Sequence, residues 1–342
     1  MTTEKNLVLE TLSLNPTPRR PVWVMRQAGR YQASFRKLRE KYSFEQLCHE
    51  VDLATQVSLK PIEQYNFDAA IVFSDILFPL RALGAKLAFT EKGPKIEPPR
   101  SVDQLEALKK TFDPNEATPA ILKTIENLRS ALPKQKAVLG FAGAPFTMLT
   151  YLLEGELTKD LSVMKRWMAE QPQIVHRWLG VLAECTGTYL DAQAESGADA
   201  VQLFDTWASA LSPKDYEEFA LPYARQVFSE VTVPGIYYVN GMAGILDQAA
   251  SVGAQALSVD WRVDLSEVRR RVPQVTALQG NMDPYHLHLS PGQLRQTVLK
   301  MLSSYGTGPG HIVNLGHGIM PSAPEDAVKV FVDTVAEFQL KT

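Results

Sequence analysis

Eight short apolar runs, separated by helical patterns, constrain the fold of this chain more than any other feature. They occupy residues 22–25, 69–74, 137–141, 200–204, 235–239, 256–259, 275–279 and 311–315. Each run is almost continuously hydrophobic, which is typical of strands buried on both faces of a parallel sheet. Strands that alternate with helices predict an α/β fold, and eight such units favour a single closed (β/α)8 TIM barrel.

The segments between the runs have helical periodicity. One apolar stripe contains Val175, Leu179, Leu182, Cys185 and Tyr189, and a second runs from 328 to 338. The second stripe follows Ser322 with Glu325 three residues later, a pattern that predicts a capping box.

A weak internal repeat supports repeated βα units. Segments 68–75, 199–205 and 255–260 each enter an apolar run through a polar residue and Ala and leave it through Asp. An open doubly wound sheet is the alternative fold, but no G-x-G-x-x-G motif follows the first run.

The chain length fits one barrel with extended loops. Of the 342 residues, about 250 suffice for a minimal barrel. We therefore expect one domain over 1–342, with residues 1–18 as a short leading segment and the remainder in long loops. Residues 77–136 form the longest connection, and its part 85–98, which contains Gly93-Pro94, predicts a hairpin.

Composition and charge exclude several classes of partner. The net charge is −3, with 45% hydrophobic and 21% charged residues, which argues against a general nucleic-acid or membrane-surface binder. No apolar run approaches the roughly 18 residues of a membrane span. The first residues lack the apolar region of a signal peptide, so we expect a cytoplasmic protein. Cys48 and Cys185 fall in helical patterns and are interpreted as reduced thiols.

A cluster of arginines follows the first apolar run. Arg26 and Arg30 are separated by Gly29, which allows a tight backbone turn, and Arg36 and Arg39 follow on the first expected helix. A guanidinium can bind a carboxylate or phosphate through two parallel hydrogen bonds. The residues between Arg26 and Arg30 are Gln, Ala and Gly, and none is a Glu that could pair with an arginine. The cluster therefore favours a site for a multiply anionic ligand over a solvated basic face.

Polar residues stand at the ends of the other runs, where (β/α)8 barrels place their chemistry. In chain order they are Arg26 with Arg30, Asp75, Tyr151 a little further along, Asp205 with Thr206, Asn240, Asp260, Gly280 and His317. The set offers neither Lys for a Schiff base nor Cys for a thiolate, and it has no metal-ligand spacing. The sequence therefore predicts a site that binds carboxylates without a metal or an organic cofactor.

Six motifs at these positions resemble the uroporphyrinogen decarboxylase family. They are MRQAGRY at 25–31, FSDIL at 73–77, GFAGAPFT at 140–147, QLFDTW at 202–207, LQGNMD at 278–283 and NLGHGI at 314–319. The resemblance implies a single (β/α)8 barrel, a homodimer and a carboxy-lyase that needs no cofactor. The implied reaction converts the four acetate side chains of uroporphyrinogen III to methyl groups, giving coproporphyrinogen III in haem and chlorophyll biosynthesis.

The resemblance also implies roles for individual residues. Asp75 would lie under the macrocycle and accept hydrogen bonds from the pyrrole N–H groups. Arg26, Arg30 and Arg39 would bind substrate carboxylates, with Gln27 also in the substrate-binding set. Tyr151 and Thr206 would contact the reacting acetate, and His317 would contact a propionate or pyrrole on the opposite wall. The implied catalytic set is Asp75, Arg26 and Tyr151.

The identity of the proton donor stays open at this point. Arg26 is placed for the role by the resemblance, but a guanidinium with a pKa above about 12 is a poor acid. A bound water or a substrate carboxyl group is the alternative donor.

Structural interpretations compete with several of these roles. Asp75 could cap the next helix, which we expect of Asp205 and Asp260. Tyr151 could be a core residue, Thr206 an N-cap and Arg36 a surface residue only. The glycines that flank His317 suggest close approach of a ligand.

Two other functions are consistent with parts of the sequence. A corrinoid-linked methyltransferase of the same superfamily would need a His/Cys ligand set for zinc, and both cysteines are remote from any strand-end His. A non-catalytic carrier of anionic tetrapyrroles would retain the arginines but would have no need for Asp75 beneath the ring.

Overall fold

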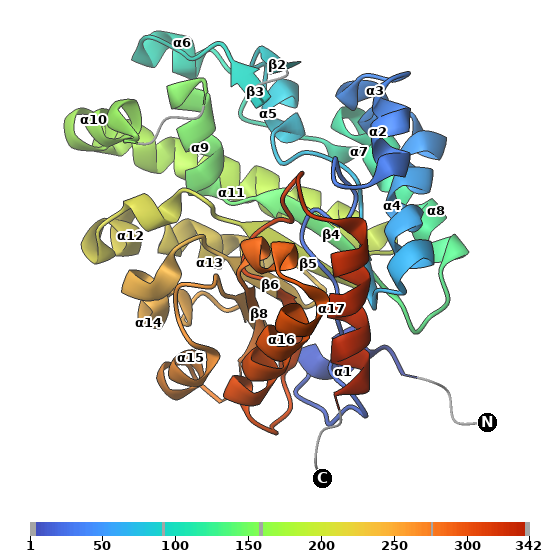
Figure 1. Ribbon diagram of the computed structural model, residues 1–342. Helices are drawn as coiled ribbons and strands as arrows, with labels where there is room; N and C mark the ends of the chain where they lie inside the picture. The colour runs from blue at the N-terminus through green and yellow to red at the C-terminus, as the bar shows by residue number, and fades with distance from the viewer. Residues whose placement is uncertain (1–4, 91–92, 157–159, 275, 339–342) are drawn as a thin grey trace.

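The predicted barrel is formed by seven consecutive parallel strands and one short bridging segment. A computed structural model describes residues 5–90, 93–156, 160–274 and 276–338. Within these residues the main sheet has the order β1-β4-β5-β6-β7-β8-β9, with every neighbouring pair parallel (Figure 1). Its strands are β1 Ala69–Ile71, β4 Ala137–Gly143, β5 Ala200–Phe204, β6 Gly235–Tyr238, β7 Ala256–Ser258, β8 Ala277–Met282 and β9 His311–Leu315.

The first apolar run closes the sheet between β9 and β1. Val22 forms a parallel bridge with Val313 of β9, and the amide of Trp23 donates to the Val313 carbonyl at 3.2 Å. On the other side, the amide of Asp68 donates to the carbonyl of Val22 at 2.8 Å. The eighth strand position is therefore occupied by a few backbone hydrogen bonds instead of an extended ladder.

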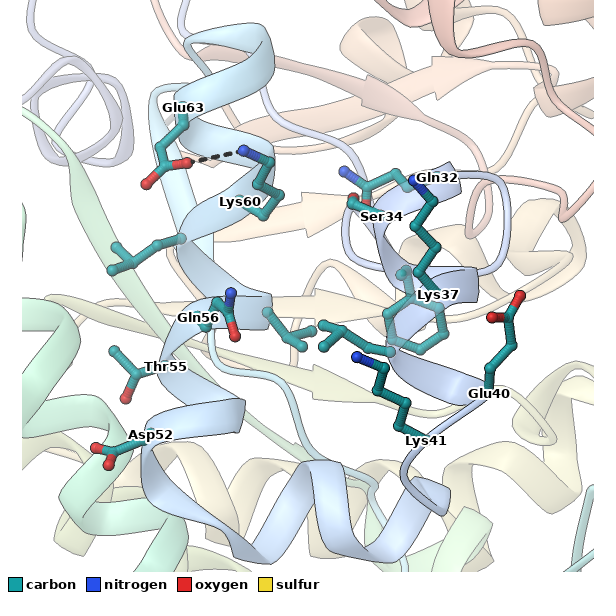
Figure 2. A pocket seen from close by; sticks show the side chains of 14 residues that line it. Gln32, Ser34, Lys37, Glu40, Lys41, Asp52, Thr55, Gln56, Lys60 and Glu63 are labelled. Carbon is teal, nitrogen blue, oxygen red and sulfur yellow. Dashed lines mark hydrogen bonds and ion pairs between the residues drawn. The ribbon is translucent and has the colours of Figure 1, made fainter.

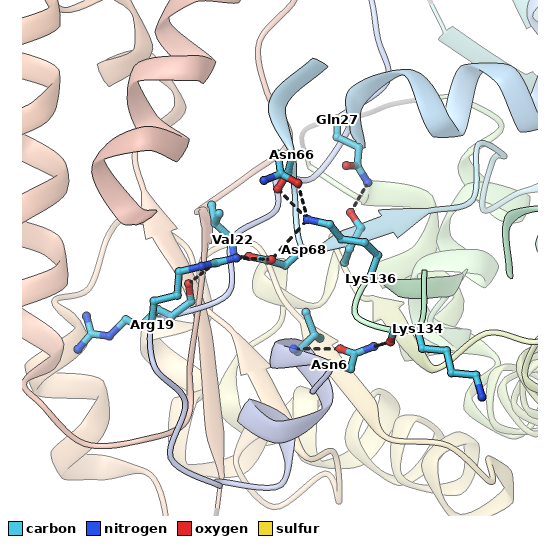
Figure 3. A network of polar contacts seen from close by, with 11 residues as sticks. Asn6, Arg19, Val22, Gln27, Asn66, Asp68, Lys134 and Lys136 are labelled. Carbon is cyan, nitrogen blue, oxygen red and sulfur yellow. Dashed lines mark hydrogen bonds and ion pairs between the residues drawn. The ribbon is translucent and has the colours of Figure 1, made fainter. Parts of the chain in front are cut away.

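Side chains strengthen this closure, as Figure 3 shows. The buried carboxylate of Asp68 accepts a hydrogen bond from the amide of Val22 at 2.8 Å. Arg19 binds both oxygens of that carboxylate, at 2.7 and 2.8 Å, and Lys136 lies 3.7 Å from it. Lys136 also donates to the Asn66 side chain at 2.8 Å. The residue before β1 thus joins the first run to the residue before β4.

Helices surround the barrel and connect its strands (Figure 1). The α-helices are α1 Leu7–Leu12, α2 Ala33–Arg39, α3 Phe44–His49, α4 Val51–Tyr65, α5 Phe78–Ala82, α6 Val102–Glu106, α7 Pro114–Ala117, α8 Pro119–Ala131, α9 Pro145–Glu154, α10 Ser162–Glu170, α11 Pro172–Glu195, α12 Pro213–Phe219, α13 Leu221–Glu230, α14 Leu246–Ala249, α15 Leu265–Arg271, α16 Pro291–Tyr305 and α17 Glu325–Glu337. Short 3-10 helices lie at η1 Ala208–Ala210, η2 Met242–Ile245 and η3 Pro284–His288.

The long connection after β1 contains the predicted hairpin. β2 Leu87–Thr90 and β3 Gly93–Ile96 pair antiparallel, and residues 91–92 between them lie outside the described residues. The amide of Ile96 donates to the carbonyl of Gly155, just after α9, at 2.6 Å. The excursion is therefore fastened back to the helix that follows β4.

The leading segment is part of the fold. Its helix α1 is capped by Asn6, whose side chain accepts from the amides of Val8 and Leu9. Val8 is fully buried and Leu12 is 4% exposed, and both belong to the main hydrophobic core. Residues 1–4 of this segment lie outside the described residues.

Two local predictions differ from the structure. The last helix begins at Glu325 after Pro324, without a side-chain cap, so the capping box predicted from Ser322 is wrong. The fixed φ of Pro324 starts the helix without a polar cap. Of the predicted strand 275–279, residue 275 lies outside the described residues, and β8 continues to Met282.

No helix in the described part of the chain combines the length and apolar character that a bilayer crossing requires.

We predict that Asp68→Ala destabilises the fold strongly, because it leaves Arg19 and the Val22 amide without their buried partner. Loss of one partner from such a pair lowers the free energy of unfolding by about 3–5 kcal/mol. Chemical denaturation measures this change. Asp333→Ala is the control, since Asp333 pairs with Lys329 on an exposed face of α17 and should cost only about 0.3–0.5 kcal/mol. Equal losses in the two variants would refute the closing role of Asp68.

Candidate active site

Arg26 leaves the first apolar run in a strained conformation that directs it across the barrel end. Its φ is +61°, in the left-handed region. A Cβ placed on Gly318 would collide with Cγ, Cδ and Nε of Arg26, so the arginine stem lies against the backbone of Gly318. The amide of Ile319 donates to the Met25 carbonyl at 2.9 Å and joins the two segments. Arg26 is thus held by residues that follow β9, while its side chain remains exposed.

The other arginines differ from one another. Arg30 is exposed, and its side chain makes no hydrogen bond or ion pair with the described residues. Arg36 donates from Nη1 to the carbonyls of Arg30 and Tyr31, at 2.9 and 2.6 Å. Arg39 donates to the Tyr42 carbonyl at 2.6 Å. Arg36 is exposed, as the surface interpretation expects, and it also holds the backbone carbonyl of Arg30.

Asp75 lies between β1 and α5. Its Oδ1 accepts from the amide of Leu77 at 2.9 Å, just before α5, and its Oδ2 forms no hydrogen bond with the described residues. Burial raises its pKa to about 6, while the Leu77 amide and the charge of Arg26 oppose that rise. Near neutral pH the carboxylate is ionised and has one oxygen available for a ligand.

Tyr151 lies on α9, near the same charges. Burial is the main cause that raises its pKa to about 12, the carboxylate of Asp75 raises it further, and Arg26 lowers it. Its ring packs edge-to-face against Trp207, with 6.0 Å between ring centroids. Tyr151 is only partly buried, so the purely core role does not describe it. Thr206, which precedes Trp207 after β5, is also partly exposed and caps no helix.

His317 follows β9 and packs edge-to-face against Trp261, with centroids 6.5 Å apart. Burial lowers its pKa, and the charge of Arg26 lowers it further. The neighbouring glycines have a structural reason. Gly318 accommodates the Arg26 stem, and a Cβ on Gly316 would strike the backbone of Asp260 and Trp261. They are required by packing within the protein, so they give no evidence of a ligand.

Gln27 is fully buried and its Nε2 donates to the Ala69 carbonyl at 3.2 Å (Figure 3), while its Oε1 has no hydrogen-bond partner among the described residues. Two other sequence predictions need correction. Asp205 does not cap a helix and instead accepts hydrogen bonds from the hydroxyls of Thr147 and Tyr237. Asp260 accepts from the amides of Gly241 and Met242, at 2.6 and 3.2 Å, and so caps η2 instead of the helix that follows it.

An aromatic row across β4, β5 and β6 was not predicted. The rings of Phe141 and Phe204 are 5.7 Å apart, and those of Phe204 and Tyr238 are also 5.7 Å apart. The phenylalanines are partly exposed. In the sequence they are indistinguishable from other residues of apolar runs, because the tertiary register alone aligns them across three strands.

The described residues contain no group of three or more His, Cys, Asp or Glu side chains arranged to hold a metal ion. Cys48 and Cys185 are both buried free thiols.

An open pocket of about 760 Å³ lies elsewhere, between α2 and α4 (Figure 2). Lys37, Lys41 and Lys60 are among its lining residues, and Phe35 and Val57 contribute apolar surface. None of the predicted site residues lines it. The converging charges at the strand ends, not this pocket, therefore define the candidate active site.

Comparison with known proteins identifies close relatives. The sequence model of the uroporphyrinogen decarboxylase (URO-D) family matches residues 3–338. The uroporphyrinogen decarboxylase of Gloeobacter violaceus is 42% identical over 339 residues, with 97% of each sequence covered. That of Synechocystis is 42% identical, with 93% of each sequence covered.

A solved structure shares the fold at lower identity. A methyltransferase from Methanosarcina mazei superposes with a TM-score of 0.86 at 20% identity, covering 99% of each chain. This similarity shows the barrel fold and carries no information on the reaction.

We predict that Asp75 titrates near pH 6 in the folded protein. Carboxyl-13C NMR measures the midpoint, and Asp75→Asn assigns the signal, since burial also raises the pKa of Asp205 to about 6. Because Arg26 lowers the pKa of Asp75, Arg26→Ala should move the midpoint to higher pH. Lys41→Ala is the control with the same loss of charge. A midpoint in the ordinary carboxyl range, or one unchanged in Arg26→Ala, would show that these groups do not interact as described.

Proposed function

The chain belongs to the uroporphyrinogen decarboxylase family, and from this premise we propose that it decarboxylates the four acetate side chains of uroporphyrinogen III to give coproporphyrinogen III. The observation that carries the proposal is the carboxylate of Asp75 at one end of the barrel. One of its oxygens has no hydrogen-bond partner among the described residues, and the exposed cation of Arg26 lowers its pKa. The relatives named above are uroporphyrinogen decarboxylases, and they match this chain over nearly their full length. The protein is accordingly a carboxy-lyase of tetrapyrrole biosynthesis.

The charges of the arginines suit this substrate. Uroporphyrinogen carries eight carboxylates on a largely apolar macrocycle. The Arg30 side chain is exposed and has no partner among the described residues, which supports a role in binding a carboxylate. Arg26 and Arg39 are also exposed. Phe141 and Phe204 of the aromatic row are partly exposed and would offer apolar surface to the pyrrole rings. The arginines would thus bind the carboxylates at the rim of the substrate, and the aromatic side chains would contact its apolar centre.

The chemistry requires an electron sink, and the substrate can supply it. Protonation of a pyrrole carbon gives a cationic ring, which accepts the electron pair released when the bond between the acetate CH2 and its carboxylate breaks. Carbon dioxide leaves, and a second proton converts the resulting methylene to a methyl group as the ring proton is lost. Asp75 would stabilise the cation because its charge acts most strongly when the ring is protonated.

Asp75 is partly buried, which suits that role. A carboxylate partly removed from water interacts more strongly with a developing cation than one in bulk solvent. Its raised pKa of about 6 still leaves it ionised at neutral pH. Arg26 opposes a further rise of that pKa and so helps to keep the anionic form populated.

The proton donor and the remaining contacts are part of the proposal. Arg26 would orient a substrate carboxyl group or a water that delivers the proton, because a guanidinium is a poor acid. Tyr151 and Thr206, both partly exposed on neighbouring segments, would contact the reacting acetate. His317, whose pKa is lowered by burial, would meet a propionate or pyrrole as a neutral imidazole. We also propose that the enzyme is a cytoplasmic homodimer, which sedimentation analysis would test for the oligomeric state.

The function is tested by an anaerobic assay with reduced uroporphyrinogen III and chromatography of the products. We expect successive loss of carboxyl groups and accumulation of coproporphyrinogen III, also after treatment with a chelator.

Asp75→Asn, which keeps the shape of the side chain and removes its charge, should lose roughly a hundredfold or more in kcat. Binding without turnover by the unmodified protein would favour the carrier function. Activity that disappears with the chelator and returns with one metal ion would contradict cofactor independence.

A second prediction concerns the arginines. Arg26→Ala, Arg30→Ala and Arg39→Ala should each lower kcat/KM roughly ten- to a hundredfold, since a charge-assisted hydrogen bond contributes about 1.5–3 kcal/mol. The loss should be larger for the octa-acid than for the penta-acid intermediate, which has fewer acetates to bind. Binding should weaken with salt, because screening becomes effective over about 10 Å at 0.1 M.

The matched control for the arginines is Lys37→Ala. Lys37 lies on the same helix as Arg39 and is exposed towards the pocket of Figure 2. Arg36→Ala is unsuitable, because Arg36 holds the carbonyls around Arg30. If Arg30→Ala loses no more than Lys37→Ala with either substrate, Arg30 does not bind a substrate carboxylate.

A further inference from the structure

Thr147 makes an unusual pair of hydrogen bonds near the candidate active site. It is fully buried in the first turn of α9, two residues after Pro145. Its hydroxyl donates to Oδ1 of Asp205 at 2.7 Å and accepts from the backbone amide of Trp207 at 3.2 Å. One side chain thus joins α9 to the turn that follows β5.

Three other buried threonines, each within a helix, bond differently. The hydroxyls of Thr11, Thr124 and Thr334 each donate to the carbonyl four residues earlier in their own helix, at 2.7, 2.7 and 2.6 Å. That arrangement satisfies a buried hydroxyl without connecting separate elements. Thr147 does not follow it, so its hydroxyl serves a tertiary contact.

Asp205 holds Thr147 from a rigid position. The carboxylate is fully buried at the end of β5, and its second oxygen accepts from the Tyr237 hydroxyl of β6 at 2.8 Å. Tyr237 in turn accepts from the hydroxyl of Tyr216 on α12 at 3.1 Å. Both oxygens of Asp205 are therefore fixed by partners that are themselves buried, which limits the movement of the group.

The far end of this chain of contacts reaches the proposed catalytic residues. The Trp207 amide, which bonds to Thr147, precedes an indole that packs edge-to-face on Tyr151 at 6.0 Å. Tyr151 lies four residues after Thr147 on α9, so the two side chains share one helix face. Thr206, the other proposed contact of the reacting acetate, lies between Asp205 and Trp207. Thr147 and Tyr151 therefore hold this turn at two points.

We propose that Thr147, held by Asp205, is a positioning residue that fixes Trp207 against Tyr151 and thereby orders Tyr151 and Thr206 for the reaction. The inference rests on the proposed function, because Tyr151 and Thr206 have their roles there. Neither Thr147 nor Asp205 touches the reacting atoms in this scheme. Their effect is transmitted through the backbone of the turn and the indole ring.

Thr147→Val and Thr147→Ser form the decisive pair. Valine keeps the shape and removes both hydrogen bonds, whereas serine keeps the hydroxyl. We expect Thr147→Val to lower kcat roughly ten- to a hundredfold with a much smaller change in KM, as misplacement of a reacting group does, and Thr147→Ser to stay near the native rate. Rescue by serine alone separates the hydroxyl's role from that of side-chain volume.

Tyr237→Phe is the matched control for loss of stability. It removes a buried hydrogen bond to the same carboxylate but leaves the contact from Asp205 through Thr147 to Trp207 intact. We expect it to lower the melting temperature about as much as Thr147→Val and to lower kcat far less. Equal kcat losses in these two variants at equal stability would overturn the proposal.

A readout independent of activity is 19F NMR of protein labelled with 5-fluorotryptophan. The chain has five tryptophans, and Trp207→Phe assigns the Trp207 signal. That signal should shift or broaden in Thr147→Val and remain in place in Thr147→Ser and Tyr237→Phe. An unchanged Trp207 signal in Thr147→Val would overturn the positioning role of Thr147, even for a protein without turnover. A shifted signal together with a native kcat would show that this positioning does not matter for the reaction. Absence of turnover in the unmodified protein would instead refute the proposed function, and the signal would still decide whether Thr147 positions Trp207.

Discussion

Closure of the barrel at Val22 is the contact on which the rest of the structure depends. Seven parallel strands curl around the core, but the eighth position is held by few backbone hydrogen bonds and by the carboxylate of Asp68. A buried carboxylate needs compensation, and Arg19 and Lys136 supply it. The same short segment leads into Arg26. The contacts of Val22, at the start of this segment, therefore help to place Arg26 at its end.

Two glycines allow segments from distant parts of the sequence to pack closely at the site. The Arg26 stem lies against Gly318, and Gly316 lies against the backbone after β7. A side chain at either glycine would displace a functional segment, so their small size serves packing within the protein. The segments that follow the first apolar run and β9 thus lie against each other, with His317 between the glycines. This arrangement links residues almost 300 positions apart through direct contact.

Asp75, which is partly buried, and Asp205, which is fully buried, illustrate two uses of a carboxylate. Burial raises the pKa of each to about 6. Asp205 has both oxygens occupied by the hydroxyls of Thr147 and Tyr237, so its charge is committed to structure. Asp75 bonds the Leu77 amide through one oxygen only. The number of oxygens left without a protein partner, and not the pKa, separates a group that can act on a ligand from one that holds the framework.

The sequence by itself determined the alternation of strands and helices, the hairpin at residues 85–98 and the arginines at the end of the first run, because hydrophobic periodicity and strand-end position are local properties. Tertiary structure alone decided that Gln27 is buried, that Arg36 holds the backbone around Arg30, and that the glycines beside His317 serve packing. It also aligned the aromatic row across β4 to β6 and the link from Asp205 through Thr147 to Trp207. These features depend on which side chains meet across different elements, and that is set by strand register and barrel closure, which no local pattern encodes.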